Sequence, residues 1–333
     1  MRMIGEAAEH TPQLDDVRVT VAIPTRERPI RLVQAVGDIW AGSRRPDELL
    51  IVCQGEGAME IARRLVEEVP GVESALRFYA SSRNGQNASL NDLVRLARGE
   101  FIALTDDDMR LPSDWLARML EVWGNDWEAG DLIVTGPIDV PESVTNPRAT
   151  PGYRPGEDRR VWRELPLVGD TLYGGHFGAP RSLFERLSAP PFDERFGPGT
   201  RFPGAGDTEL ARRALAKGMP IVFDPGVRAT HLADPSSWIR SQHLHSIGDG
   251  AMFAVRASEG EPGMFGVAVR TLAAVTAKGL HNLAMLRVRE GAGRLYGAVG
   301  LIRGAWRWWR GDEKHEPRTR VPAPDELRLV ELA

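Results

Sequence analysis

The sequence FIALTDDDM, residues 101–109, places three consecutive aspartates directly after an apolar run. The run predicts a buried β-strand, because short apolar stretches between polar segments are typical of strands covered on both faces. On an extended segment, Asp106 and Asp108 share one side and Asp107 lies on the other. Carboxylates at the C-terminal end of a parallel strand are well placed to hold Mg²⁺ or Mn²⁺ against a diphosphate. The competing interpretation is a solvated acidic turn before the next helix.

Strands and helices alternate on the N-terminal side of this motif. Apolar or β-branched runs predict strands at 17–23, 48–53 and 76–80, and helical patterns lie between and after them at 29–40, 59–69 and 90–98. This alternation predicts a mostly parallel sheet with helices on both faces. The expected fold class is therefore α/β.

A helix is expected after the motif, with Ser113 as its N-cap. Its apolar positions follow the i, i+3, i+4, i+7 spacing of a core-facing helix and are Leu116, Met119, Leu120 and Trp123. Residues 131–136 predict another strand. Residues 141–160, rich in Pro, Gly and charge, predict a loop over the site.

The remaining sequence adds a helix, two short strands and a long helical region. The helix is expected at 207–218, where it ends at a glycine. The region from 238 to about 309 is helical in pattern, with breaks near Gly260 and Gly291, and the last twenty residues are polar and expected to be loose. The short strands are expected at 220–223 and 227–231.

Composition narrows the class of protein. Hydrophobic residues make up 42% and charged residues 26% of the chain, which is typical of a folded globular protein. The single cysteine, Cys53, excludes an intramolecular disulfide and favours a reducing compartment. No secretory signal and no uncharged apolar run of about 18 residues is found. We expect a cytoplasmic protein, at the inner face of the membrane if it contacts lipid.

The charge is uneven along the chain. A net charge of −4 argues against nucleic acid as a partner, because binding a phosphate backbone needs a basic face. Residues 240–320 nevertheless carry 13 Lys and Arg against 7 Asp and Glu. Part of the C-terminal third is therefore suited to an anionic partner.

Three blocks resemble the successive signatures of family 2 glycosyltransferases: VTVAIPTRERP (19–29), SRNGQNASLNDLVRLARGEFIALTDDDM (82–109) and GAGDTELARRALAKG (204–218). They occur in the family's order and spacing, and the resemblance covers about residues 17–235. It implies the GT-A fold, a Rossmann-like and mostly parallel sheet. It also implies inverting transfer of a sugar from a nucleotide-diphosphate sugar to an acceptor hydroxyl, with a divalent metal.

The resemblance implies which residues bind the nucleotide sugar. By position these are Pro24, Thr25, Arg26, Arg28, Gln54, Arg83, Asn84, Asp106, Asp107, Gly174 and Gly175. The glycine pair suits backbone amides that approach the donor closely. Gln54 replaces the acidic residue that usually holds the base, although its amide can still bond to a pyrimidine edge. Asn91 is a further match that is equally open to a structural interpretation, and for His176, which could contact donor or acceptor, the structural interpretation is favoured.

The same resemblance implies the catalytic and metal-binding residues. Asp207 matches the base that takes the proton of the acceptor hydroxyl, although a glycine replaces the first member of the usual acidic pair. Glu209 is an alternate. The competing roles are an N-cap for Asp207 and a partner of the helix dipole for Glu209. Asp108 and His231 match the metal ligands, for Mn²⁺ or Mg²⁺.

The C-terminal region interleaves Trp and Arg in RLYGAVGLIRGAWRWWRG, residues 294–311. This pattern suits a membrane interface, where a lipid-linked acceptor would lie; the alternatives are a helix packed on the catalytic domain and a small-molecule acceptor. The Gln-x-x-Arg-Trp element of processive relatives is missing, so we expect transfer of a single sugar. The expected organisation is a flexible tail at 1–16, the GT-A domain at 17–235, a helical extension at 236–311 and a polar tail at 312–333.

Two other functions remain to be weighed. A nucleotidyltransferase would carry a Gly-rich, Lys-containing loop after the first strand, and IPTRERP at 23–29 has neither residue type. A non-catalytic scaffold of the same fold is favoured by Gln54 and by the aromatic C-terminal segment. The acidic residues and His231 being in place argue against the scaffold.

Overall fold

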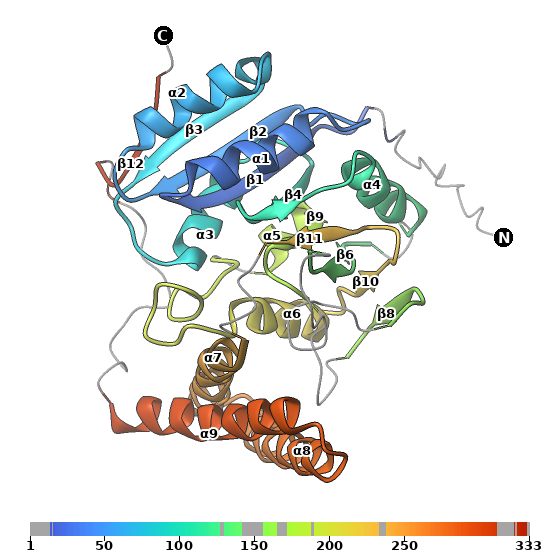
Figure 1. The fold of residues 1–333 in the computed structure, drawn as a ribbon, viewed down its shortest axis with the longest axis vertical. Helices are drawn as coiled ribbons and strands as arrows, with labels where there is room; N and C mark the ends of the chain where they lie inside the picture. Colours follow the sequence, from blue (N-terminus) through green and yellow to red (C-terminus); the bar gives the residue numbers. More distant parts are fainter. Residues whose placement is uncertain are drawn as a thin grey trace, which may run out of the picture.

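The computed structural model describes residues 14, 16–126, 130–141, 156–164, 172–187, 190–232, 238–311, 323 and 325–331. Within these residues the chain forms a nine-stranded sheet, a three-stranded sheet and three long C-terminal helices (Figure 1). Most of the predicted N-terminal tail, most of the predicted loop at 141–160 and the start of the predicted C-terminal tail lie outside the described residues.

The first half of the chain is a parallel sheet with crossover helices, as predicted. Its elements are β1 (Val19–Arg26), α1 (Pro29–Trp40), β2 (Glu48–Gln54), α2 (Ala58–Glu68), β3 (Leu76–Ser81), α3 (Gln86–Leu96) and β4 (Phe101–Thr105). The strands lie in the order β3-β2-β1-β4, and every neighbouring pair is parallel. The C-terminal ends of β1 and β4 therefore lie side by side, at the end of the sheet where its parallel strands finish.

The second half widens this sheet and adds a small one. Its elements are β5 (Met109–Arg110), α4 (Trp115–Asn125), β6 (Ile133–Thr135), β7 (Ile138–Asp139), β8 (Arg160–Trp162), β9 (His176–Pro180), α5 (Arg181–Arg186), α6 (Gly206–Ala216), β10 (Ile221–Phe223) and β11 (Ala229–His231). Strand β9 runs antiparallel between β4 and β6. Strand β11 joins β5 and β7 in the small sheet, so its last residue lies beside the end of the aspartate motif.

Two apolar cores cover the two faces of the large sheet. One joins alternate strand residues such as Val21 and Ile51 to α1, α2 and α4. The other joins the intervening residues, such as Ala22 and Val52, to α3, α5 and α6. This division follows from the alternation of side chains along each strand. The apolar positions predicted for the helix after the motif are all buried in the first core.

The C-terminal helices are α7 (Trp238–Ser258), α8 (Met264–Ala284) and α9 (Val288–Arg310). Both predicted breaks are present, since residues 259–263 separate α7 from α8 and residues 285–287 separate α8 from α9, although Gly291 itself lies in the first turn of α9. A Cβ at Gly291 would lie 2.6 Å from Leu283 side-chain atoms and 3.0 Å from the carbonyl oxygen of Gly279. The glycine therefore serves the close crossing of α9 over α8 and not the end of a helix.

Two predictions about local structure are wrong. Helix α4 begins at Trp115 with Asp114 at the N-cap and no side-chain cap, so Ser113 does not cap it. The last twenty residues are not all loose, because β12 (Leu327–Leu329) pairs antiparallel with β3 at the edge of the large sheet (Figure 1). Without β12, strand β3 would be the edge strand and its outer backbone N–H and C=O groups would be unpaired. The backbone of β12 forms hydrogen bonds with these groups.

Candidate active site

A large cavity opens at the sheet edge where β1 and β4 end, with a volume of about 1320 Å³. From the β1 side it is lined by Pro24, Thr25, Arg26, Arg28 and Arg31. The aspartate motif, Gln54, the glycine pair, Asp207 and His231 also line it. The parallel sheet therefore brings most of the predicted site residues to one cavity.

The aspartate motif does not continue the strand. Asp107 and Asp108 lie in a turn after β4, so the predicted alternation of the three side chains is wrong. One guanidinium nitrogen of Arg28, Nη1, lies 3.2 Å from Oδ1 of Asp107 and 3.1 Å from Oδ2 of Asp108. The two neighbouring carboxylates converge on the same cation, which an extended segment would not allow.

Asp107 is tied to the end of β1. The hydroxyl of Thr25 donates a hydrogen bond of 2.6 Å to its Oδ2, and Arg28 contacts the other oxygen. Burial raises the pKa of Asp107 above its ordinary value, against the hydrogen bond from Thr25. Asp107 therefore anchors the segment that follows β1 on the end of β4.

Asp108 is the most heavily engaged of the three aspartates. Arg28 and Arg31 each approach its Oδ2 to 3.1 Å, and Nε2 of His231 lies 3.2 Å from its Oδ1. Burial alone would raise the pKa of Asp108, but the contacts with His231 and the two arginines lower it. His231 in turn lies 3.3 Å from the hydroxyl of Tyr173. Asp108 is held as a carboxylate at the wall of the cavity.

Asp106 faces a different set of neighbours. The side chain of Gln86 donates a 2.9 Å hydrogen bond to Oδ1 of Asp106. The backbone N–H of Asp106 donates to the carbonyl oxygen of Gly175. A Cβ built on Gly175 would lie 2.1 Å from Oδ2 of Asp106, so this position accepts only glycine while the carboxylate stays in place. Burial and the neighbouring carboxylate of Asp108 raise the pKa of Asp106 to about 7.

Asp207 lies in the first turn of α6. It is not the N-cap, because that position is Ala205, which has a left-handed φ of 66°. The backbone N–H of Gly174 donates to Oδ2 of Asp207 at 3.2 Å, and that of Thr208 donates to Oδ1 at 2.8 Å. Since Gly174 contacts Asp207 and the next residue contacts Asp106, the glycine pair separates these two carboxylates.

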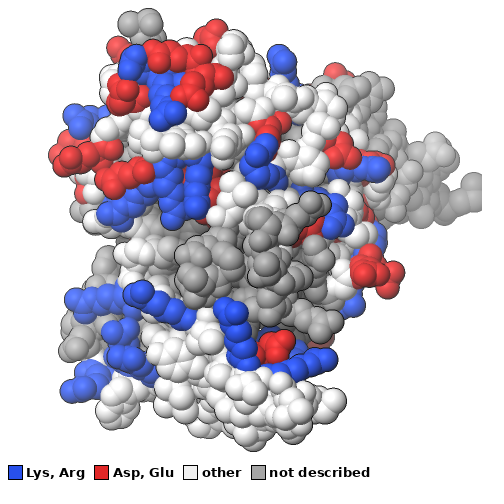
Figure 2. All heavy atoms as spheres, in the orientation of Figure 1, with Lys and Arg blue, Asp and Glu red and all other residues white. Residues whose placement is uncertain are grey.

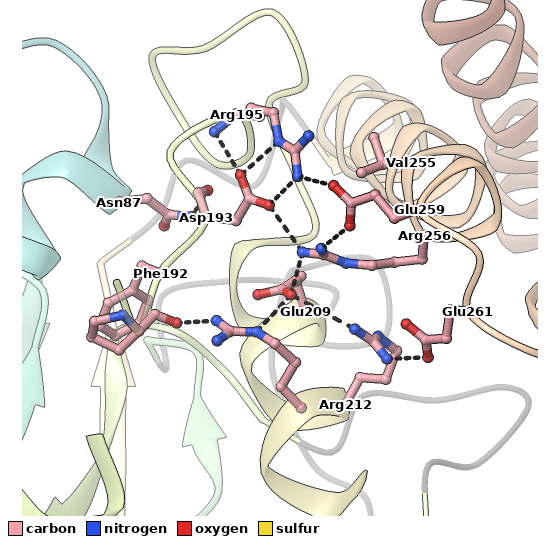
Figure 3. Close-up of polar contacts among 12 residues, drawn as sticks. Asn87, Phe192, Asp193, Arg195, Glu209, Arg212, Val255, Arg256, Glu259 and Glu261 are labelled. Atoms are coloured by element: carbon pink, nitrogen blue, oxygen red, sulfur yellow. Dashed lines mark hydrogen bonds and ion pairs between the residues drawn. The ribbon is translucent and has the colours of Figure 1, made fainter. Parts of the chain in front are cut away.

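The alternate base, Glu209, belongs to a buried network instead (Figure 3). Its side chain is fully buried, is not among the residues that line the cavity, and accepts from Arg213 at 2.7 Å and from Arg256 of α7. Arg256 also lies 2.9 Å from Oδ2 of Asp193, which pairs with Arg195. These residues join α6 to α7, so Glu209 has a structural role.

Several other predicted residues also have structural surroundings. Arg83 is buried and pairs with Asp92 at 3.0 Å and with Glu194 at 2.7 Å, and neither Arg83 nor Asn84 is among the residues that line the cavity. Asn91 exchanges two hydrogen bonds with the backbone of Phe192, at 2.8 and 2.9 Å. These side chains shape the loop that precedes α6.

His176 is fully buried behind the cavity. The indole N–H of Trp115 donates to its Nδ1 at 3.2 Å, so its Nε2 carries the proton that bonds to the carbonyl oxygen of Val227 at 2.9 Å. Burial lowers the pKa of His176 to about 4. The neutral ring links β9 to the segment before β11, which supports the structural interpretation.

The cavity continues from Asp207 across the C-terminal helices. This arm is lined by Asp249 and Met252 of α7, by Val267 and Arg270 of α8, and by Arg294 of α9. A Cβ at Gly204 would lie 2.3 Å from the carbonyl oxygen of His245, so the loop before Asp207 packs directly on α7. The extension therefore forms one wall of the site.

Few side chains are available as metal ligands. Among the residues that the structure describes, no group of three or more His, Cys, Asp or Glu side chains is arranged to hold a metal. Asp108 and His231 present an oxygen and a nitrogen 3.2 Å apart, close to the roughly 3 Å between adjacent ligands of an octahedral ion with bonds of about 2.1 Å. Such a pair fits a metal that takes its other ligands from water and a diphosphate.

Comparison with known proteins settles the family. The model of the family described as glycosyl transferase family 2 matches residues 20–188, about half of the chain. The chain belongs to glycosyltransferase family 2. A protein of Haloferax volcanii named glucosyl-dolichyl phosphate glucuronosyltransferase is 22% identical over 224 residues, which cover 65% of this chain and 68% of that protein. This glycosyltransferase family and the named relative identify the chain as a transferase.

Solved structures confirm the GT-A fold of this family 2 glycosyltransferase. The mannosyltransferase PcManGT from Pyrobaculum calidifontis, in complex with GDP-Man and Mn²⁺, superposes with a TM-score of 0.60 at 19% identity and covers 87% of this chain and 88% of that one. GalNAc-T7 with UDP, GalNAc and Mn²⁺ superposes with a TM-score of 0.50 at 14% identity, over 72% of this chain and 51% of the other. The α/β fold with C-terminal helices is thereby confirmed.

Three polar residues of the glycosyltransferase site were not predicted from the sequence. Arg31 contacts Asp108, Gln86 contacts Asp106, and Tyr173 contacts His231. Arg31 follows Arg28 by three residues at the start of α1, the spacing that places two side chains on one helix face. Gln86 opens α3 directly after Gly85, whose φ is 98°. For Arg31 and Gln86 the sequence signal is therefore a polar residue in the first turn of a helix that follows a strand.

Proposed function

We propose that this chain transfers a single sugar, with inversion, from a nucleotide-diphosphate sugar to an acceptor hydroxyl. The observation that carries the proposal is the glycine pair that separates Asp106 from Asp207. One carboxylate belongs to the aspartate motif at the donor end of the cavity, and the other opens toward the C-terminal helices. If donor and acceptor meet next to these glycines, the anomeric carbon of the donor lies between the carboxylates of Asp106 and Asp207.

Asp207 is the proposed base. As the acceptor oxygen attacks the anomeric carbon, its proton passes to the Asp207 carboxylate, and the bond to the diphosphate breaks on the opposite side. The N–H groups of Gly174 and Thr208 fix the direction of the carboxylate.

The diphosphate would be held at the other end of the site. Asp108 and His231 are the proposed ligands of Mn²⁺ or Mg²⁺, which supplies positive charge next to the leaving diphosphate. Arg28 and Arg31 now contact Asp108, and their guanidinium groups are within reach of the same place. PcManGT and GalNAc-T7, solved with nucleotide or nucleotide sugar and Mn²⁺, support this role.

The nucleoside is expected along the ends of β1 and β2. Pro24, Thr25, Arg26 and Gln54 line the cavity there, and the Gln54 amide donates a 2.9 Å hydrogen bond to the carbonyl of Gly85. The carbonyl oxygen of this amide is the group available to a base. Arg83 and Asn84, predicted to bind the nucleotide, are proposed to support this wall instead of contacting the ligand.

The acceptor would enter along the C-terminal helices. Arg270 and Arg294 form no ion pair with any residue that the structure describes, and apolar side chains such as Val267 and Met252 line the same arm. Guanidinium groups beside an apolar wall suit a phosphate on an apolar chain. The Haloferax relative is named for a glucosyl-dolichyl phosphate, which supports a lipid-linked acceptor here.

The first test is a thermal-shift panel of UDP, GDP, dTDP, CDP and their sugar conjugates, with and without Mn²⁺ or Mg²⁺. We expect one nucleotide family to stabilise the protein only when metal is present, followed by release of sugar from that donor. A folded protein that responds to none of these ligands would favour the non-catalytic scaffold.

A further inference from the structure

Large apolar side chains are exposed along α8 and α9. The exposed fraction is 77% for Phe265 and 56% for Leu280 of α8, and 58% for Ile302 and 61% for Trp306 of α9. We call these residues, with their neighbours on the same faces, the apolar stripe: Phe265, Val269, Leu280, Tyr296, Val299, Ile302, Trp306 and Trp309. On α9 successive members of the stripe are three or four residues apart, and on α8 they are four and eleven residues apart, which is about one and three helical turns. The members on each helix therefore lie on one face of that helix.

Most of the apolar stripe lies opposite the faces that the helices use for packing. A Cβ at Gly300 or Gly304 of α9 would lie within 2.7 Å of backbone carbonyl oxygens of α7, so this face is closed by direct backbone contact. On α8, Val267 lines the cavity while Phe265 and Val269 are exposed. Tyr296 takes part in this packing, since its ring stacks on that of His243 of α7 with the centroids 3.9 Å apart. The exposed side chains of Phe265, Val269 and Ile302 lie away from the packing faces, and exposed patches of this kind mark interaction sites.

The two helices also carry a strong positive charge. From Met264 to Arg310 the sequence has eight Lys and Arg and one acidic residue, Glu290. In Figure 2 the end of the molecule formed by these helices is mostly white, with blue side chains around it and little red. A second copy of the chain would bring like charges together at this surface, whereas an anionic surface would be attracted to it.

We infer that the apolar stripe of α8 and α9 docks on the surface of an anionic lipid bilayer. The helices lie in the plane of the interface, with apolar and Trp side chains among the upper acyl chains and the arginines at the headgroups. Among the described helices, none has the length and apolarity needed to cross a bilayer. The inference rests on the proposed function and deepens it, because the helices that dock on the bilayer also form one wall of the cavity arm that leads to Asp207.

Co-sedimentation with vesicles tests the inference directly. The protein should bind vesicles that contain phosphatidylglycerol more strongly than vesicles of phosphatidylcholine alone, and added salt should weaken that binding. The double variant Ile302→Ser, Trp306→Ser should bind at least about tenfold more weakly. The double variant Arg287→Gln, Arg303→Gln should lose about fivefold for each arginine on anionic vesicles only.

Met59→Ser is the matched control. Met59 on α2 has an exposed fraction of 57%, nearly that of Ile302, but lies on the catalytic domain. This variant should bind vesicles like the wild type, and all variants should keep the wild-type melting temperature and donor hydrolysis in the absence of lipid. Failure of the proposed function would appear as lost donor hydrolysis with vesicle binding intact.

Two results would overturn the inference. One is equal loss of binding in the Met59→Ser control and in the stripe variant. The other is a dimer in light scattering that Ile302→Ser, Trp306→Ser disperses, together with no vesicle binding by the wild type, which would assign the stripe to a second copy of the chain.

Discussion

Nε2 of His231 lies 3.2 Å from Oδ1 of Asp108. The contact exists because β11 pairs antiparallel with β5, which follows the aspartate motif and sets His231 opposite Met109. The small sheet thus delivers a histidine from the end of the catalytic domain to the carboxylate that follows the central strand. Most of the chemistry proposed for this site depends on that pairing.

Metal-dependent nucleotide binding should require this pair. Asp108→Asn and His231→Ala should each weaken the metal by at least the roughly tenfold loss that removing even an outer partner of a ligand causes. Thermal shift with nucleotide and a Mn²⁺ titration measures the change. His281→Ala is the control, since His281 is an exposed residue of α8 that is not among those lining the cavity. Unchanged Mn²⁺ dependence in both site variants would remove the proposed metal ligands.

The glycine pair should respond unequally to alanine. At Gly175 a Cβ would lie 2.1 Å from Oδ2 of Asp106, whereas at Gly174 its nearest contact is an ordinary 3.5 Å to Cβ of Asp207. Gly175→Ala should therefore displace the Asp106 carboxylate and lower kcat/KM at least about tenfold, a displacement cost of more than about 1.4 kcal/mol. Gly174→Ala should stay within about threefold of the wild type. Steady-state kinetics with the donor that the nucleotide panel identifies would compare them, and equal losses would contradict the steric argument.

Substitution of Asp207 should lower the reaction rate, whereas substitution of Glu209 should lower the stability of the protein. Loss of a general base costs about 10²–10⁴ in rate, so Asp207→Asn should lower kcat by that factor with little change in KM or melting temperature. Glu209→Gln should instead weaken the buried network with Arg213 and Arg256 and lower the melting temperature. If Asp207→Asn kept full turnover, the base would have to be sought elsewhere in the cavity.

His176 should make stability depend on pH. Its pKa is about 4 in the folded protein and 6.5 ordinarily, so its neutral form contributes fully above pH 6.5. As the pH falls from 6.5 toward 4 the unfolded chain takes up a proton that the folded chain does not, and stability is lost, by about 2 kcal/mol at pH 5.

Urea unfolding at pH 7 and pH 5 measures this loss. His176→Gln should lower stability at both values but remove this part of the pH dependence, because glutamine does not titrate. Parallel losses in wild type and variant between the two pH values would show that His176 is not the group responsible.

The helices and strands that depend on a local residue pattern could be predicted from the sequence. The helix at 29–40 is found with those bounds, and the strand before the aspartate motif is fully buried as its apolar run indicated. Contacts between distant parts of the chain could not be predicted. Arg83 matched a nucleotide-binding motif, yet Asp92 and Glu194 hold it in the interior, and the second of these comes from a loop more than a hundred residues later.

The packing role of Gly291 and the pairing of the chain end could not be predicted, for a related reason. A glycine in a helical pattern signals either an end or a close crossing, and only the packing of α9 on α8 decides in favour of crossing at Gly291. The pairing of β12 could not be predicted either, since three residues far from the rest of the sheet carry too little pattern. In both cases the deciding contact is tertiary.

The network around Arg256 means that the extension is no detachable module. If the chain were cut before α7, the carboxylates of Glu209 and Asp193 would lose a guanidinium that bonds to both, at a place where neither is reached by solvent. A truncated catalytic domain would then either unfold or let the first turn of α6 drift, and Asp207 with it. We therefore expect substitutions in the extension to be tolerated better on the outer faces of the helices than at the ion pairs of Arg256.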